Sequence, residues 1–409
     1  MDRRSYLSAL GVVAAGSLAG CSGNGSGDGG SDGEESDGSE PDGADTDGSD
    51  TVGVTVETVT EGLEHPWGVA FLPDGKRLLV TERDAGRLSL VDRESGEREP
   101  LGGTPEVYAG GQGGLLDVAV HPGFPDEPWV YLTYSATNDT GASGTHLGRG
   151  RLDPGAARLS SFELLHAAEP FVESDGHYGS RVVFGTDGAA YLTVGDRQFK
   201  NFGPDHVAQN TTNELGATLR LAPDGSVPDD NPFLEDPDVE DTIFSYGHRN
   251  PQSMAVHPET GELWQAEHGE RDGDEINVLE RGGNYGWPVA TYACEYGTDD
   301  PVGDRPDERE EFVEPVHYWE CGSGGFPPSG AAFYDGEAFP AWRGDLFLGN
   351  LAGEYLGRFA VDGRSVEERE PLLTDRGWRI RAIESAPGNG GLHVAIDGDP
   401  APIVRLVPE

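Results

Sequence analysis

Short runs of β-forming residues alternate with polar turns along most of this chain. One phrase, a Pro-Asp-Gly-like turn followed by an apolar run and a second polar turn, occurs six times. Its copies cover residues 71–82, 121–134, 184–196, 257–264, 339–349 and 386–395. A turn followed by a strand is typical of an antiparallel hairpin, and a spacing of roughly 50 to 80 residues indicates propeller blades or another repeat array. The pattern predicts an all-β chain whose residues 53–409 form a six-bladed β-propeller with antiparallel four-stranded blades.

Composition agrees with this fold class and indicates where a ligand would bind. The 62 glycines and 29 prolines suit a turn-rich all-β protein, and long helical periodicity is hard to find beyond the first 20 residues. Loops from every blade meet at the mouth of a propeller channel. That mouth is the natural place for a small-molecule site.

The charge balance excludes one class of partner. Seventy-four acidic side chains stand against 28 basic ones, for a formal net charge of −46. No basic stripe is available to neutralise phosphates, so we expect no binding to nucleic acid. We interpret the acidity as adaptation to high salt, which screens the repulsion within a compact chain. An ordinary acidic protein with an acidic tail is the alternative.

The N-terminus has the pattern of an export signal. Arg3 and Arg4 precede an apolar stretch, residues 10–19, that is too short to span a bilayer. Residues 1–21 resemble a twin-arginine signal peptide that ends in a lipobox, Leu18-Ala19-Gly20-Cys21. Cys21 would then carry the lipid. The alternative is an ordinary signal peptide with a chance cysteine.

Residues 22–52 are nearly all Gly, Ser and acidic residues. Such a segment buries nothing and repels itself, so it predicts a disordered tether. We therefore expect a protein that is exported and anchored to the outer face of the cell membrane only through lipid at Cys21. Outside the cell a disulfide is permissible, but spacing alone leaves open whether Cys294 and Cys321 form one. Monomer and homodimer both remain open.

Three glycine-rich clusters carry candidate catalytic side chains. Gln112 lies among glycines that allow a ligand to approach closely. His177 lies in a polar loop before the third repeat and is a candidate general base, although this loop taken alone favours a surface histidine. Asp196 closes the strand of that repeat and could orient a nearby histidine.

Three further clusters suggest binding of anions and metal. Arg249 could stabilise an anionic cofactor or an oxyanion, or could cap a turn. Residues 267–277 and 284–288 concentrate oxygen donors and glycines that suit calcium without the spacing of an EF-hand; a solvated acidic loop is the alternative. Strand alternation places Arg379 and Arg381 on one face, where both could grip carboxylates.

Together these clusters resemble the soluble glucose/aldose sugar dehydrogenases that depend on pyrroloquinoline quinone (PQQ), the glucose/sorbosone dehydrogenase-like family. The acidic, lipid-anchored form resembles haloarchaeal lipoproteins. The resemblance extends from about Leu63 to Leu406. Its motifs, in the order of the family, are His65-Pro66-Trp67-Gly68, residues 111–117, Gly176-His177, Gly195-Asp196, residues 247–252, residues 273–277 and residues 379–381. The resemblance implies a six-bladed propeller with the quinone over the channel mouth, in agreement with the repeats.

The resemblance also implies roles for individual residues. His177 matches the base that removes the proton of the sugar C1 hydroxyl, Asp196 matches the acid that holds this histidine, and Arg249 matches the arginine that polarises the quinone oxygens. The implied cofactor-binding residues are Gln112, Arg249, Asn250, Gln252, Tyr296, Ser329, Leu351, Ala352, Arg379 and Arg381. Calcium would be held by the backbone carbonyls of Gly269 and Glu270, with a structural calcium at Glu275 and Tyr285.

Several positions depart from the family pattern. Glu270 stands where proline is usual, which makes that loop less rigid. Ala352 replaces a lysine of the glucose-specific branch and indicates the aldose branch with its broader substrate range. Ala382, Tyr178 and Ser180 also vary. These changes bear on substrate range and cofactor affinity more than on the fold.

The leading hypothesis is an exported quinoprotein that oxidises aldose sugars at C1 to lactones and passes electrons to an external acceptor. A second hypothesis is a non-catalytic propeller that binds a sugar or a protein. The candidate base and the arginine pair argue against it, because a binding module needs neither. A third is a calcium-dependent lactonase, which would need a cage of carboxylates and asparagine that the blades do not supply.

Overall fold

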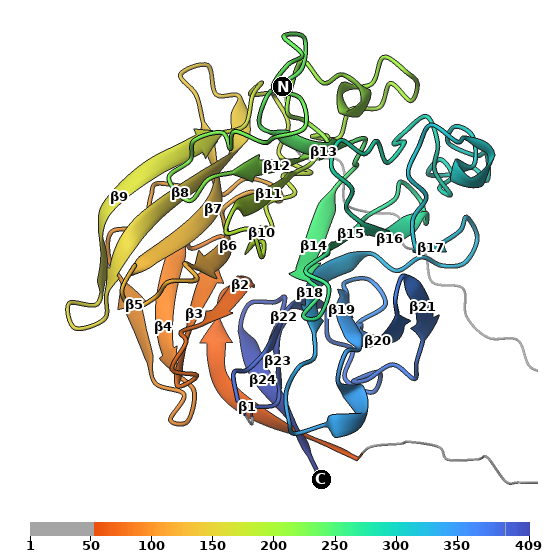
Figure 1. Ribbon diagram of the computed structural model, residues 1–409. Helices are drawn as coiled ribbons and strands as arrows, with labels where there is room; N and C mark the ends of the chain where they lie inside the picture. Colours follow the sequence, from red (N-terminus) through yellow and green to blue (C-terminus); the bar gives the residue numbers. More distant parts are fainter. Residues whose placement is uncertain (1–52, 389) are drawn as a thin grey trace, which may run out of the picture. The chain divides into compact units, whose positions relative to one another are not determined.

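The computed structural model describes residues 53–388 and 390–409. Its strands form six antiparallel four-stranded sheets, which are the blades of a β-propeller (Figure 1). Blade 1 contains β2 (Pro66–Phe71), β3 (Arg77–Glu82), β4 (Arg87–Asp92) and β5 (Arg98–Leu101). Blade 2 contains β6 (Leu115–Val120), β7 (Trp129–Thr137), β8 (Ser143–Asp153) and β9 (Arg158–Ala167). Blade 3 contains β10 (Val182–Phe184), β11 (Ala190–Val194), β12 (Ala217–Leu221) and β13 (Ile243–Tyr246).

The remaining blades follow the same order, with one exception. Blade 4 contains β14 (Pro251–Val256), β15 (Leu263–Glu267), β16 (Asp274–Val278) and β17 (His317–Trp319). Blade 5 contains β18 (Pro328–Phe333), β19 (Leu346–Asn350), β20 (Tyr355–Asp362) and β21 (Ser365–Glu368). Blade 6 contains β22 (Ile380–Ser385), β23 (Leu392–Ile396), β24 (Ala401–Pro408) and β1 (Val54–Leu63). Three short 3-10 helices, η1 (Val207–Gln209), η2 (Pro306–Glu308) and η3 (Pro340–Trp342), lie in the described connections.

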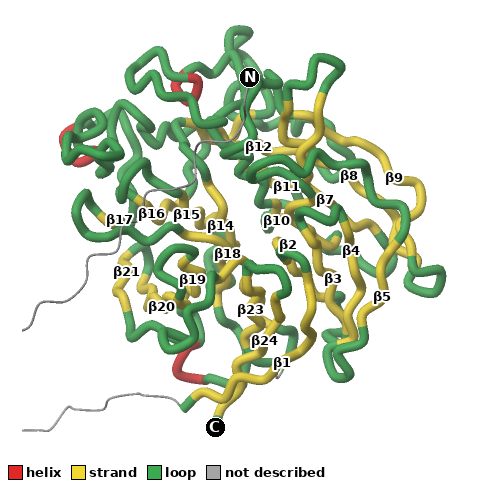
Figure 2. The backbone as a smooth tube through the Cα atoms, turned by 180° about the vertical axis from the view of Figure 1, so that it is seen from behind, coloured by secondary structure: helices red, strands yellow, loops and turns green. Residues whose placement is uncertain are grey.

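The predicted fold is confirmed, and so is the placement of the repeats. Each of the six phrases lies at the turn between the first and second strands of a blade. The first strands β2, β6, β10, β14, β18 and β22 pack side by side around the axis. Figure 2 shows the same arrangement from behind. Because the repeat turns occupy one edge of each blade, the start of the first strand and the end of the second meet at the opposite edge.

Blade 6 is closed by the two ends of the described chain. Strand β1 pairs with β24 in a register that runs from Val54 opposite Pro408 to Leu63 opposite Ala401. The N-terminal strand therefore forms the outer strand of the last blade. This pairing joins the first strand to the last and leaves no gap in the ring of blades.

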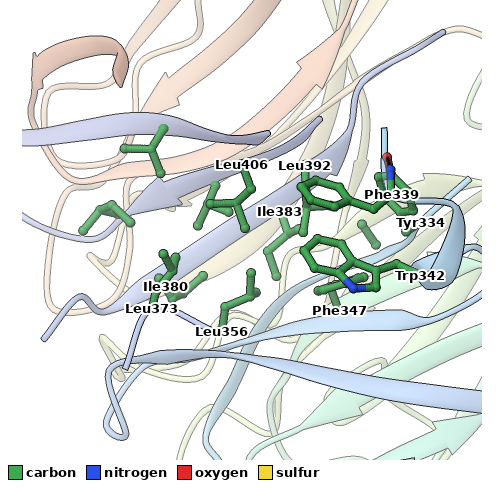
Figure 3. Packing of buried hydrophobic residues seen from close by; sticks show 14 of the residues in the cluster. Tyr334, Phe339, Trp342, Phe347, Leu356, Leu373, Ile380, Ile383, Leu392 and Leu406 are labelled. Carbon is green, nitrogen blue, oxygen red and sulfur yellow. Dashed lines mark hydrogen bonds between the residues drawn. The ribbon is translucent and has the colours of Figure 1, made fainter. Parts of the chain in front are cut away.

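Hydrophobic clusters fill the spaces between blades. The second strands are almost wholly buried in several blades; β11, β15 and β23 have no exposed position. Figure 3 shows the cluster between blades 5 and 6, in which Phe339 stacks on Trp342 with ring centroids 3.8 Å apart. The fifth repeat turn is thus part of the core, because it folds as η3 and buries Trp342.

Two expectations about the chain outside the blades have different outcomes. Cys294 and Cys321 form a disulfide, with their Cα atoms 5.5 Å apart. The predicted signal peptide, Cys21 and the tether lie in residues 1–52, outside the described residues. In the part that the structure describes, no helix has the length and apolar character that crossing a membrane requires.

Candidate active site

A cavity of about 700 Å³ opens at the blade edge opposite the repeat turns. It is lined by eight of the predicted cofactor residues: Gln112, Asn250, Gln252, Tyr296, Leu351, Ala352, Arg379 and Arg381. These residues come from the starts of first strands, the ends of second strands and the loops beside them. The antiparallel hairpin brings both strand ends to one edge, which is why residues far apart in the sequence share this cavity.

His177 and Asp196 form a buried pair at this edge. His177 lies before β10 and Asp196 follows β11, and their Nδ1 and Oδ1 atoms are 2.6 Å apart. The indole Nε1 of Trp287 donates to the other carboxylate oxygen of Asp196 at 2.8 Å. The backbone N–H of His177 donates to Oε1 of Gln112 at 2.8 Å, which joins the pair to the cavity wall. Within the described residues, Nε2 of His177 makes no hydrogen bond.

The surroundings keep this histidine neutral and the aspartate ionised. Burial and the nearby Arg249 cation lower the pKa of His177, and Asp196 opposes them only in part. Burial would raise the pKa of Asp196, but the interactions with His177 and Arg249 outweigh it and lower the pKa. At neutral pH the pair is therefore an imidazole held by a carboxylate, which is the state that a general base needs.

The backbone around the pair is constrained. His177 has φ of 49°, a left-handed conformation that residues other than glycine adopt infrequently. Gly195 lies against it, and a Cβ atom at position 195 would lie 2.2 Å from the carbonyl oxygen of His177. A side chain at this position would displace the histidine loop. Strain of this kind is often found at functional sites.

Arg249 takes part in a chain of charges rather than lining the large cavity. Its Nη2 donates to Glu270 at 2.6 Å, and Lys200 donates to the same carboxylate at 2.5 Å. Its Nε is buried and has no partner within the described residues. Glu270, which replaces the usual proline, therefore orients the guanidinium through its side chain.

The predicted arginine pair does share a face, because Arg379 and Arg381 both line the cavity. Arg381 donates to Asp397 at 2.8 Å and to Oε1 of Gln252 at 3.0 Å. Burial lowers the pKa of Arg381 to about 10, although Asp397 opposes the shift. Arg379 is more exposed and donates to the carbonyl of Leu351 at 3.0 Å. Ser329 does not line the cavity; it is buried below and accepts from Arg381 at 3.3 Å.

Sequence reasoning assigned no role to several residues of the cavity wall. They are His65, Trp67, Arg83, His268 and Asp397. His65 and Trp67 belong to a motif of the resemblance, and His268 lies in the predicted calcium loop. Asp397 carried no local signal, because its partners His65 and Arg381 belong to other parts of the chain.

The cavity is suited to an anion with several carboxylates. Its lining contains three arginines, Arg83, Arg379 and Arg381, but only one carboxylate, Asp397. The Nε of Arg381 and the Nε2 of His268 are buried without a partner among the described residues. Burial and the Arg249 cation lower the pKa of His268 to about 3, so this ring is neutral. A ligand that brings oxygen atoms would accept a hydrogen bond from the Nε–H of Arg381.

Three of the four predicted metal residues line a second, small cavity. Gly269, Glu275 and Tyr285 line it together with Glu267. Burial and repulsion from Glu267 raise the pKa of Glu275 well above its ordinary value. Nearby Asn277 has a buried Oδ1 without a partner among the described residues. These oxygen donors suit a hard cation, which would lower the repulsion between the two carboxylates.

No group of three or more His, Cys, Asp or Glu side chains placed to hold a metal occurs in the described part of the chain. The predicted calcium ligands would not form such a group, because two of them are backbone carbonyls. Glu270 lies outside the small cavity's lining, and its carboxylate is engaged by Arg249 and Lys200.

The family follows from a match that spans the propeller. The sequence model described as "Glucose / Sorbosone dehydrogenase" matches residues 63–405. The chain belongs to the glucose/sorbosone dehydrogenase family. This family membership confirms the resemblance that the motifs predicted.

Three relatives of the family illustrate the likeness. Aldose sugar dehydrogenase YliI of Escherichia coli is 38% identical over 360 residues, which are 87% of this chain and 93% of the relative. A crystal structure of a glucose dehydrogenase has a TM-score of 0.80 at 40% identity and covers 86% of this chain and 99% of its own. The PQQ-bound aldose sugar dehydrogenase of Streptomyces coelicolor has a TM-score of 0.69 at 27% identity, with 87% and 99% covered.

Proposed function

We propose that this member of the glucose/sorbosone dehydrogenase family is a PQQ-dependent enzyme that oxidises aldose sugars at C1 to lactones. The observation that carries the proposal is the His177–Asp196 pair, with a 2.6 Å hydrogen bond, beside a cavity whose wall holds three arginines. The names of the relatives support a sugar as substrate, and the PQQ-bound relative supports the quinone.

His177 acts as the general base of this reaction. Its neutral imidazole takes the proton of the sugar C1 hydroxyl at Nε2, and Asp196 stabilises the resulting imidazolium through Nδ1. Trp287 and Gln112 hold the pair in place. PQQ, when bound, would supply the acceptor for the hydride that the sugar loses from C1, and an external acceptor would take up the electrons.

Arg379, Arg381 and Arg83 would hold the carboxylates of PQQ, and Tyr296 would cover its ring. The unpartnered Nε of Arg381 would donate to one of its oxygen atoms. Arg249 would orient its reactive edge. Calcium would bind the carbonyls of Gly269 and Glu270, and a second ion would bind at Glu275 and Tyr285.

The setting of the enzyme belongs to the same proposal. Residues 1–21 would direct export, lipid at Cys21 would anchor the protein to the outer face of the membrane, and residues 22–52 would tether the propeller. Because the chain carries a net charge of −46 and most of its acidic residues lie in the blades, the propeller would need molar salt to fold and act.

The test is reconstitution from purified parts. The chain from about Thr51 is purified in molar KCl, PQQ and calcium are added separately and together, and dye reduction is followed with a panel of aldoses. We expect sugar-dependent reduction only when both additions are present. Failure of PQQ to bind, with no reaction of any aldose, would overturn the proposal and favour a propeller that only binds a sugar or a protein.

A further inference from the structure

One arginine side chain joins all six blades on the propeller axis. Arg181 immediately precedes β10 of blade 3 and is buried, with 5% of its surface exposed. Its N–H groups donate to the first strands of the other five blades. The acceptors are Gln252 O at 2.7 Å, Asp117 Oδ1 at 3.1 Å, Trp67 O at 3.4 Å, Arg381 O at 2.7 Å and Ser329 Oγ at 3.3 Å.

These contacts match what one guanidinium offers. An arginine has five N–H donors in a planar fork, and five acceptors receive them here. The acceptors belong to β14, β6, β2, β22 and β18. The backbone N–H of Arg181 donates to Thr193 Oγ1 of its own blade at 2.9 Å. No other amino acid could supply this set, because lysine has three donors that radiate from one atom.

Three of the five residues that accept from the Arg181 side chain lie in the wall of the large cavity. Trp67, Gln252 and Arg381 line that cavity. The Arg181 guanidinium stacks on the Trp67 ring with its carbon 4.0 Å from the ring centre. Ser329 Oγ accepts from both Arg181 and Arg381, and it donates to the carbonyl of Arg381 at 2.9 Å. The position of the Arg381 side chain therefore depends on Arg181 through two routes.

The buried cation is compensated where it lies. Asp117 binds it through Oδ1, and its Oδ2 accepts from the backbone N–H of Val182 at 3.0 Å. A buried charge is tolerated only when it is paired and hydrogen-bonded. Arg381 has its own counter-charge in Asp397. The two arginines thus lie close together, each with its own carboxylate.

We propose that Arg181 is a positioning residue of the cofactor site: it closes the channel beneath the cavity and holds Trp67, Gln252 and Arg381 in the arrangement that binds PQQ. The inference rests on the proposed function. Arg181 touches no ligand, yet it controls the affinity of the site for PQQ. It does so through the same hydrogen bonds that hold the blades together.

The test compares Arg181→Lys with Arg220→Lys. Arg220 is a similarly buried arginine of blade 3 that pairs with Asp187 and Asp230, far from the cavity wall. Dissociation constants for PQQ are measured with calcium in molar KCl by quenching of tryptophan fluorescence, together with Tm. We expect both variants to lose thermal stability, but only Arg181→Lys to raise the Kd for PQQ, by at least tenfold. The Kd of Arg220→Lys should stay within twofold of the wild type.

The outcomes separate the two proposals. If the wild type binds PQQ and Arg181→Lys binds it equally well, Arg181 is only structural and the inference is overturned, while the proposed function stands. If the wild type binds no PQQ, both are overturned. If Arg181→Lys does not fold, Ser329→Ala takes its place, because it removes the oxygen shared by Arg181 and Arg381. A rise of about threefold or more in Kd supports the inference, and an unchanged Kd overturns it.

Discussion

Two histidine–carboxylate pairs lie at the same edge of neighbouring blades. In blade 3, His177 lies before β10 and Asp196 follows β11. In blade 4, His248 lies before β14 and Glu267 ends β15. In each pair the histidine and the carboxylate residue are 19 positions apart in the sequence. The hydrogen bond between them measures 2.6 Å in blade 3 and 2.7 Å in blade 4. The His248–Glu267 pair lies two residues closer to its strands than the His177–Asp196 pair does, so the two pairs are alike in form but not in position.

The pairs differ in what the second ring nitrogen meets. Nε2 of His248 lies 2.9 Å from Ser245 Oγ, and its ring stacks on Tyr285 at 4.6 Å. Nε2 of His177 makes no hydrogen bond within the described residues. The backbone N–H of His177 donates to Gln112, which lines the large cavity. A histidine–carboxylate pair is thus structural when both ring nitrogens are engaged. It can act as a base only when one nitrogen is free beside a cavity.

The largest effect is expected when the free nitrogen is removed. His177→Ala should lower kcat by about 10²–10⁴-fold, because the base is lost while the cavity remains. The PQQ Kd should change little, and fluorescence titration checks this separately from dye reduction. An unchanged kcat would reject His177 as the base and would make its pair equivalent to that of His248.

The matching change in blade 4 should act on stability. His248→Ala leaves the Glu267 carboxylate without its ring partner and removes the stacking on Tyr285, so we expect a loss of about 3–5 kcal/mol in the free energy of unfolding. Denaturant titration in molar salt measures it. The kcat of the folded fraction should fall far less than in His177→Ala. A loss of activity as large as that of His177→Ala, at unchanged stability, would contradict the comparison.

A smaller effect is expected from the backbone that holds His177. Gly195→Ala places a Cβ atom 2.2 Å from the His177 carbonyl oxygen, so the loop must move; we expect a loss of about 1–3 kcal/mol in stability together with a lower kcat. Gly203→Ala is the matched control, since a Cβ atom there meets nothing within 4 Å. Equal stability and kcat in the two variants would show that the tight packing is not needed.

The smallest expected effect is on the pH dependence of kcat/KM. His177 acts when it is neutral, and burial together with Arg249 lowers its pKa below the ordinary 6.5. The plateau of kcat/KM should therefore persist as pH falls through 6.5 and decline only at lower pH, when the ring gains a proton. Lys200 is a minor contributor to the same lowering.

Lys200→Gln should raise the pKa of His177 and move the acid limb slightly to higher pH, because the cation is half exposed and screened by salt. Lys76, the other lysine of the chain, lies at the first repeat turn on the opposite edge. Lys76→Gln should leave the limb in place. A shift to lower pH in Lys200→Gln would reverse the sign and contradict this account.

The sequence predicted much of the site because local patterns carry it. Each repeat contains its own turn and strand, so six blades could be inferred without knowing how they pack. Gln112, His177 and Asp196 lie in polar, glycine-rich segments at strand ends, and a hairpin brings such ends together. Resemblance to the family added the roles of Arg249 and of the arginine pair.

Other features could not be read locally. Ser329 was expected to contact the cofactor, but it lies beneath the cavity and supports Arg381. Glu270 was expected to act through its carbonyl, whereas its carboxylate also binds Arg249. The disulfide between Cys294 and Cys321 was left open and is present.

By itself the sequence determined the class of fold, the number of blades and most of the side chains at the channel mouth, because turns, strands and motifs are encoded within short segments. Only the tertiary structure decided which histidine pair is open, that β1 closes the last blade, and that Arg181 reaches all six. These depend on contacts between residues from opposite ends of the described chain, such as Val54 and Pro408. Such contacts exist only once the ring has closed and its axis has been filled.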